Sequence, residues 1–200
     1  NVELMGKSVF ADCDSLEKIV LPNKIQSIQS YSFYRCKNLK EVVLGSGLEN
    51  IWDNSFAECE NLSSINLTGK TKYIGEKAFE GCKKLIDIGD SSGVSFVGYK
   101  AFNDTPWYNS QKEVDGCKYV GKVLVECLDK TKTDIQLKEG TTMIAEASLE
   151  GTRINNLDFL QGIKIIGDRA FENCSNLVFA NIPVGVEYLG NNIFYSCQNL

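Results

Sequence analysis

Eight cysteines are the residues of this 200-residue chain whose type and spacing most readily suggest chemistry. Six of them recur at an interval of 23 residues in two runs: Cys13, Cys36, Cys59, Cys82, then Cys174 and Cys197. Metal sites favour close pairs of the form Cys-x-x-Cys, and the chain has none. This cysteine column therefore leaves three readings open: buried thiols packing as small apolar residues, some disulfide bridging, or a metal site.

The remaining two cysteines, Cys117 and Cys127, flank the dipeptide Gly121-Lys122 within apolar segments. That pattern is typical of a β-hairpin, whose two strands would bring these thiols near each other, so a disulfide between them stays an alternative. Histidine is absent from the chain, which removes His-containing catalytic triads and His-ligated zinc.

Carboxylates and aromatic side chains supply the other candidates for binding. The carboxylates are Glu41, Asp87, Asp134 and Asp158. They would suit a basic partner or calcium, or they solvate an outer face; a carboxylate pair for glycoside hydrolysis is a further reading. The neighbours Trp107 and Tyr108 would form an aromatic platform for a sugar or peptide, or would anchor a segment to the core.

Composition narrows the class of partner. The net charge is -5 and the isoelectric point is near 4.9, whereas nucleic-acid binding needs clustered Lys and Arg, so we expect no nucleic-acid partner. The same charge argues against an anionic membrane surface. No apolar run approaches the roughly 20 residues of a membrane helix, so we expect no membrane insertion in this stretch of chain.

The elements that would position these residues are indicated by an internal repeat. Phenylalanines recur every 23 residues from Phe10 to Phe102 and again at Phe171 and Phe194. A first apolar column contains Ile19, Val42, Ile65, Ile88, Ile135, Leu157 and Ala180, and a second, two residues on, includes Leu21, Leu67 and Phe159. A third column contains Met5, Ile28, Ile51, Ile74, Val97, Ile144, Ile166 and Leu189.

A unit of 23 residues cannot bury an apolar face by itself, but stacked units cover one another. Alternation from Lys18 to Leu21 predicts a short strand with Ile19 inward and Val20 outward, and its copies would stack in parallel about 4.8 Å apart. The Phe-x-x-Cys segments predict a helical or 3₁₀ turn, because residues i and i+3 share a face. Recurring glycines predict tight turns with positive φ: Gly47, Gly93, Gly140, Gly162 and Gly185.

The phrases "SIQSYSFYRCKNLKEVVL", "YIGEKAFEGCKKLIDI" and "IIGDRAFENCSNL" resemble the leucine-rich repeats of the BspA-like family, found on surface proteins of bacteria and some protozoan parasites. The resemblance covers essentially the whole chain. It implies an α/β fold: a right-handed leucine-rich-repeat solenoid with a parallel β-sheet on one face and short helical or 3₁₀ turns opposite. It also implies a cell-surface or extracellular setting.

The repeat is interrupted once. Phe102 and Ile135 are 33 positions apart where Phe10 and Ile19 are 9 apart, so 24 residues are inserted. We expect residues 1–200 to form a single solenoid domain, a fragment of a longer protein, with a β-hairpin insertion at residues 106–130.

These observations favour a non-enzymatic recognition or adhesion module without cofactor, catalytic residue or metal. We expect it to bind a protein partner, a host or microbial surface protein, through the sheet face and the insertion. The partner-binding candidates are Glu41, Asp87, Asp134, Asp158, Trp107 and Tyr108. The alternatives are a structural spacer array and a glycan-binding accessory domain of a larger surface protein.

Overall fold

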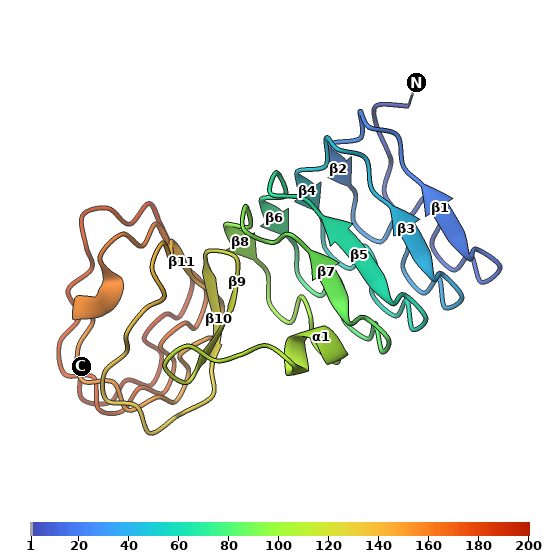
Figure 1. Ribbon diagram of the computed structural model, residues 1–200. Coiled ribbons are helices and arrows are strands. Elements are labelled where there is room, and N and C mark those ends of the chain that lie inside the picture. Colours follow the sequence, from blue (N-terminus) through green and yellow to red (C-terminus); the bar gives the residue numbers. More distant parts are fainter. Residues whose placement is uncertain (1) are drawn as a thin grey trace. The chain divides into compact units, whose positions relative to one another are not determined.

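The computed structural model describes residues 2–200, apart from the side chain of Phe159, and it divides into two compact units. The N-terminal unit is Asn1–Gln111 and the C-terminal unit is Lys112–Leu200. Each unit is a solenoid of parallel coils (Figure 1). The expected place of Phe159 in the second column lies outside the described side chains, and a single domain over residues 1–200 stays a prediction.

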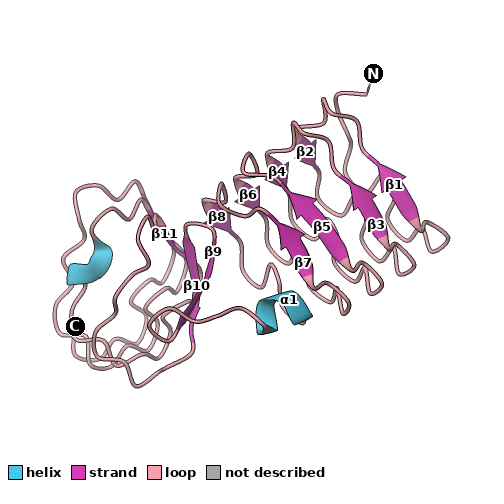
Figure 2. Ribbon diagram, in the orientation of Figure 1, coloured by secondary structure: helices cyan, strands magenta, loops and turns pink. Residues whose placement is uncertain are grey.

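Two parallel sheets run along the N-terminal unit (Figure 2). The first sheet contains, in spatial order, β1 (Lys18–Val20), β3 (Glu41–Val43), β5 (Ser64–Leu67) and β7 (Asp87–Gly89). The second sheet contains β2 (Ser27–Ile28), β4 (Asn50–Ile51), β6 (Tyr73–Ile74) and β8 (Phe96–Val97). The first column of the repeat was expected to form a sheet and does so; the third column forms a second sheet that the sequence analysis did not predict.

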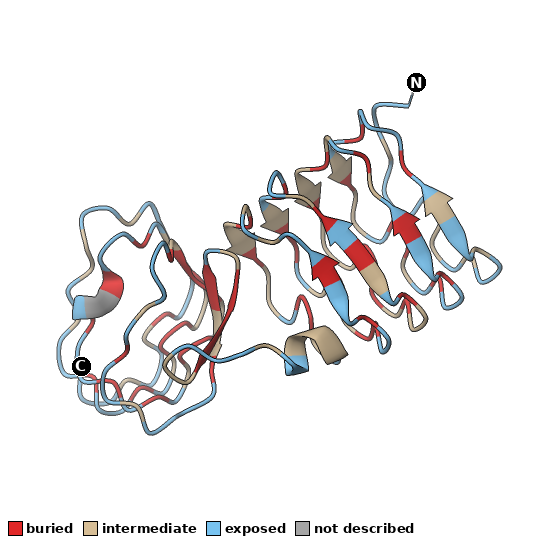
Figure 3. Ribbon diagram, viewed as in Figure 1, coloured by how far each residue is buried: buried red, intermediate tan, exposed pale blue. Residues whose placement is uncertain are grey.

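The register of both sheets is the repeat itself. Ile19 pairs with Val42 in the first sheet, and Ile28 pairs with Ile51 in the second, each partner 23 residues on. Val42 is buried while its neighbours Glu41 and Val43 are exposed, so side chains alternate between core and solvent (Figure 3). Strands of two to four residues suffice because each coil must turn again to close around the core.

The Phe-x-x-Cys segments are hydrogen-bonded turns and not helices. Around Phe79, the Glu80 amide donates to the Lys77 carbonyl (3.1 Å) and the Cys82 amide to the Phe79 carbonyl (3.2 Å). The alternate amides bond to the next coil, as Phe79 N–H does to the Ala101 carbonyl (2.7 Å). Lys77, two residues before Phe79, has a φ of 53°, a left-handed conformation that costs a non-glycine residue about 1–2 kcal/mol. The ladder of bonds between coils offsets that strain.

The phenylalanine column forms a continuous stack of rings in the N-terminal unit. The ring centroids of Phe33 and Phe56 lie 5.0 Å apart, and those of Phe56 and Phe79 lie 5.3 Å apart, with the planes within 5° of parallel. Phe10 and Phe102 extend the stack at its two ends. Phe33, Phe56 and Phe79 are completely buried, so each ring shields the next from water.

The cysteine column packs beside this stack as free thiols. The Cys59 Sγ donates to the Phe33 carbonyl of the preceding coil (3.0 Å), and the Cys82 Sγ repeats the contact with Phe56 (3.1 Å). Burial raises the pKa of Cys36 to about 11 and raises the pKa values of Cys59 and Cys82 further. These thiols therefore stay protonated, and they serve packing and hydrogen bonding.

The C-terminal unit contains a five-stranded sheet in the order β13 (Tyr188–Leu189), β12 (Ile165–Ile166), β11 (Met143–Ile144), β10 (Val123–Cys127) and β9 (Cys117–Val120). β9 and β10 are antiparallel and joined at Gly121-Lys122, whereas β10 pairs in parallel with β11. Leu124 pairs with Ile144 of the third column, and Cys127 N–H donates to the Ser148 carbonyl (2.8 Å) as the column phenylalanines do elsewhere. β10 therefore takes the place of a solenoid strand.

Two short helices complete the elements. α1 (Pro106–Asn109) belongs to the N-terminal unit, and its first residue follows Thr105, whose hydroxyl accepts from the Tyr108 amide (3.2 Å). η1 (Asp158–Leu160) is a 3₁₀ helix in the C-terminal unit. Residues 134–137 and 156–157, which the repeat predicted as strands, are irregular there. Directly before them, the Asn155 amide donates to the Thr133 carbonyl (3.0 Å) of the preceding coil.

Four of the five recurring glycines have one of two causes. The prediction of positive φ was wrong for Gly185, where a Cβ would also meet nothing closer than the Lys164 Nζ at 3.8 Å. Gly140 and Gly162 have φ values of 78° and 84°, as predicted. Gly47 and Gly93 do not have positive φ; instead, a Cβ on Gly47 would lie 2.4 Å from the Asn23 carbonyl oxygen, and one on Gly93 would lie 2.0 Å from that of Gly69. Close approach of successive coils, and not turn conformation, requires glycine at these two positions.

We expect Phe79→Ala to destabilise the chain by about 3–5 kcal/mol, because it removes a buried ring and leaves a cavity between two others. Equilibrium denaturation measures the change. The control is Glu41→Gln on the exposed face, which should alter the free energy of unfolding by about 0.5 kcal/mol or less. An unchanged stability in Phe79→Ala would show that the stack is not part of the core.

We also expect the cysteine column to resist thiol reagents in the native state. Cys59 and Cys82 are buried with raised pKa values, so a disulfide reagent at pH 8 should modify them only when the chain unfolds. Half-buried Cys13 and Cys197 should react first. Peptide mapping after timed labelling checks the order, and rapid labelling of Cys59 would contradict it.

Candidate functional site

A cavity of about 560 Å³ opens on the C-terminal unit and is a candidate binding site. Its lining comes from two successive coils, residues 134–141 and the segment around η1, which contributes Asn156, Asp158 and Gln161. Pockets that hold small ligands or side chains are commonly of this size.

The core determines which side chains face this cavity. Ile135, Leu157 and Leu160 are buried, whereas Asp134, Asn156 and Asp158 are exposed. Asn156 Oδ1 accepts a hydrogen bond from the Asp158 amide (3.0 Å), in a turn that directly precedes the 3₁₀ helix. The two coils thereby present Asp134 and Asp158 to the same space.

Three carboxylates give the cavity a negative charge. They belong to Asp134, Glu139 and Asp158, while the only lysine in the lining, Lys138, turns its Nζ to the Gly121 carbonyl (3.3 Å). The side-chain amides of Gln136, Asn156 and Gln161 add donors and acceptors. The cavity can therefore accept hydrogen bonds from a cationic or hydroxyl-rich group.

The wall at residues 136–138 is fixed from behind by two side chains. Asp115 Oδ2 accepts from the Gln136 amide (2.8 Å), and the Tyr119 hydroxyl accepts from the Lys138 amide (3.4 Å). The bond from Gln136, together with the Lys132 ammonium, lowers the pKa of Asp115. Burial raises the pKa of Tyr119 to about 12. The wall is thus held in place before any ligand arrives.

The structure brings together two of the four carboxylates predicted from the sequence. Asp134 and Asp158 line the cavity. Glu41 and Asp87 lie on the first sheet of the N-terminal unit, each paired with Ser64 of the strand between them, and Glu41 also forms an ion pair with Lys18 (2.9 Å). Partner binding by any of the four stays a prediction.

The two predicted aromatic candidates lie in α1. Both are half-buried. The Trp107 ring packs on Phe102 with centroids 4.7 Å apart, and its amide donates to the Leu85 carbonyl (2.7 Å). These contacts support the anchoring reading of Trp107, since its ring continues the phenylalanine stack.

Sequence reasoning missed several residues. Glu139 and Gln161 line the cavity, and each directly precedes a recurring glycine. The residue type at that position changes from coil to coil, so the repeat gave no reason to select them. It also missed Trp52, Tyr73 and Phe96 beside the second sheet, whose rings stack with centroids 4.6 and 4.4 Å apart. Tyr73 and Phe96 each precede a third-column residue, and that position was the available signal.

The described residues contain neither a cluster of metal ligands nor a membrane-spanning helix. Within residues 2–200, no group of three or more Cys, Asp or Glu side chains is arranged to hold a metal ion. Among the same residues, neither helix has the length and apolarity required to cross a bilayer.

Solved structures with similar architecture come from several bacteria. A leucine-rich repeat protein of T. pallidum is 23% identical with a TM-score of 0.49, and the match covers 97% of this chain and 69% of that one. One from Bacteroides ovatus is 18% identical with a TM-score of 0.44, covering 98% and 68%. The pneumococcal vaccine antigen PcpA is 21% identical with a TM-score of 0.43, covering 92% and 60%.

No curated protein matches the chain in sequence. The family model for the BspA type leucine-rich repeat region matches residues 3–122 and 125–200, in six copies. These matches agree with the 23-residue register of both sheets in the N-terminal unit. The chain is a member of the BspA-type leucine-rich repeat family.

Proposed function

We propose that the chain is a non-enzymatic recognition or adhesion module that binds a protein partner at the cell surface or outside the cell. Family membership supports the setting, since BspA-like repeats occur on surface proteins. The acidic cavity of the C-terminal unit supports the binding role.

The observation that carries this proposal is the convergence of Asp134 and Asp158 on one cavity from successive coils. A concave surface with three carboxylates complements a basic segment of a partner. A lysine or arginine side chain that enters the cavity would exchange its hydrogen bonds to water for hydrogen bonds to carboxylates. Such an inserted side chain would carry a large share of the affinity, as hot-spot residues do.

Rigidity favours this mode of binding. The backbone of the cavity wall is hydrogen-bonded to Asp115 and Tyr119, and the core side of each coil is closed by Ile135 and Leu157. A preorganised surface loses little conformational entropy on association, so more of the contact energy appears as affinity.

A glycan is the second candidate ligand, and a specific observation favours it. The cavity also presents the amides of Gln136, Asn156 and Gln161, groups that hydrogen-bond to sugar hydroxyls as readily as to peptides. The chain would then be the glycan-binding accessory domain of a larger surface protein. The spacer reading assigns no ligand to the cavity.

Affinity capture with the intact chain as bait separates these functions. We expect capture and chemical cross-linking of surface extracts to recover a specific protein whose cross-links map to residues 134–141 and 156–161. Binding confined to a glycan array would favour the accessory reading, and failure of both assays would leave the spacer.

The double variant Asp134→Asn/Asp158→Asn should weaken binding of the recovered partner about tenfold or more, because it removes two acceptors of positive charge. Titration at two salt concentrations measures the loss and its electrostatic origin. The matched control is Glu187→Gln, an exposed carboxylate of the same unit that pairs with Lys164 outside the cavity. Equal losses in both variants would contradict a role for the cavity.

A further inference from the structure

Cys117 and Cys127 lie directly opposite each other on the antiparallel strands β9 and β10. Leu128 N–H donates to the Gly116 carbonyl (2.9 Å), so the bonds flank the cysteine pair and the two residues form a non-hydrogen-bonded pair. The Cα atoms of such pairs are about 4.5 Å apart, within the range that a disulfide spans.

This geometry differs from that of the cysteine column. Column cysteines are stacked in parallel, which keeps their Cβ atoms about 4.8 Å apart, farther than the ~3.8 Å usual in disulfides. Their thiols also donate to carbonyls one coil back, as Cys82 does to Phe56. Of the eight cysteines, the opposed pair on the hairpin is therefore the one suited to bridging.

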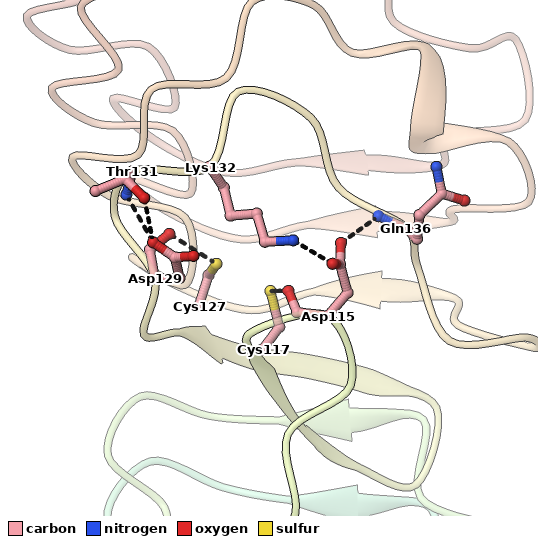
Figure 4. A network of polar contacts seen from close by, with 7 residues as sticks. All are labelled: Asp115, Cys117, Cys127, Asp129, Thr131, Lys132 and Gln136. Atoms are coloured by element: carbon pink, nitrogen blue, oxygen red, sulfur yellow. Dashed lines mark hydrogen bonds and ion pairs between the residues drawn. The ribbon is translucent and has the colours of Figure 1, made fainter.

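The surroundings of the pair are polar on one side (Figure 4). Cys117 Sγ lies 3.7 Å from the Asp115 carbonyl oxygen, and Cys127 Sγ lies 3.6 Å from that of Asp129. A thiol–thiol hydrogen bond lowers the pKa of Cys127, with Lys130 adding to the effect, and raises the pKa of Cys117. Of the two thiols, Cys127 therefore loses its proton more readily.

We propose that Cys117 and Cys127 form a dithiol–disulfide site, oxidised by exchange with a small disulfide. The Cys127 thiolate attacks the external disulfide, forms a mixed disulfide and releases one thiolate. The Cys117 thiol then loses its proton, attacks the Cys127 sulfur of the mixed disulfide and releases the second thiolate of the external disulfide. Two protein thiols lose two electrons, and the external disulfide is reduced to two thiols that take up the two protons.

Both sulfurs are buried, so exchange takes place while the hairpin is locally open or during folding. The bond would join the Asp115–Gly116 turn to the loop that begins at Leu128. That loop is already held by Asp129, which accepts from the Thr131 amide (3.0 Å), and by the ion pair between Lys132 and Asp115. Because Asp115 also holds Gln136, oxidation stiffens the wall of the cavity.

The experiment refolds the chain from denaturant in buffers of reduced or oxidised glutathione, followed by alkylation of the denatured product and peptide mapping. We expect eight alkylated cysteines under reduction, six under oxidation, and a linked peptide joining Cys117 to Cys127. Hydrogen exchange at residues 129–136 should be slower in the oxidised form. The melting temperature should rise by roughly 5 °C, because the bridge restricts the unfolded chain.

Two variants keep the readout specific. The redox-dependent shift in melting temperature should vanish in Cys117→Ser and persist in Cys82→Ser, whose cysteine belongs to the column. If Cys117→Ser does not fold, the mapping of the unaltered chain decides. Eight alkylated cysteines after oxidative refolding, or bridges among column cysteines, would overturn the proposal. Neither result bears on partner binding, which is measured separately.

Discussion

Hydrogen bonding between successive coils is the constraint on which the rest of the structure depends. Each coil satisfies its backbone by bonding to the equivalent atoms of the next, in the two sheets and also along the turns, where Phe79 N–H meets the Ala101 carbonyl. Because every coil must repeat the path of its neighbour, equivalent side chains are brought into contact with each other. The residue type at a position such as Phe56 is therefore determined more by contacts with the neighbouring coils than by local secondary-structure propensity. The stack of phenylalanine rings and the thiol hydrogen bonds both follow from these contacts.

The same constraint explains which features were predictable from the sequence. Ile51 and Phe56 could be assigned to the core because a residue that recurs every 23 positions must contact its own copies in the neighbouring coils. Apolar side chains make such contacts away from water without losing hydrogen bonds. The second sheet could not be recognised, since two residues such as Asn50–Ile51 show no alternation. The turn was predictable in outline, because a spacing of three from Phe79 to Cys82 fits a turn closed by an i to i+3 hydrogen bond, which the structure has. The left-handed φ of Lys77 could not be recognised from that spacing.

The candidate site was partly predictable for a related reason. Outward positions beside a buried column follow from alternation, which is how Asp134 and Asp158 were selected. Their convergence on one cavity depends instead on departures from the repeat: the coil from Leu149 to Phe171 is 22 residues long and contains the 3₁₀ helix η1 in place of a strand. Glu139 and Gln161 stand at equivalent positions, each before a recurring glycine, but the residue type there does not repeat, so periodicity did not select them.

Departures from the repeat are concentrated in the C-terminal unit, and so are the acidic cavity and the opposed cysteine pair. In a regular solenoid the outer face is a shallow sheet. Its outward side chains are exposed and contribute nothing to the core, as Val20 and Val43 illustrate. In the C-terminal unit, β10 takes the place of a solenoid strand and pairs in parallel with β11. On its other side β10 pairs with the antiparallel strand β9, which the regular coils do not have. That coupling places two cysteines opposite each other and lets Asp115 reach Gln136. The regular coils supply the frame, and both proposed sites, the acidic cavity and the opposed cysteine pair, lie where that frame is interrupted.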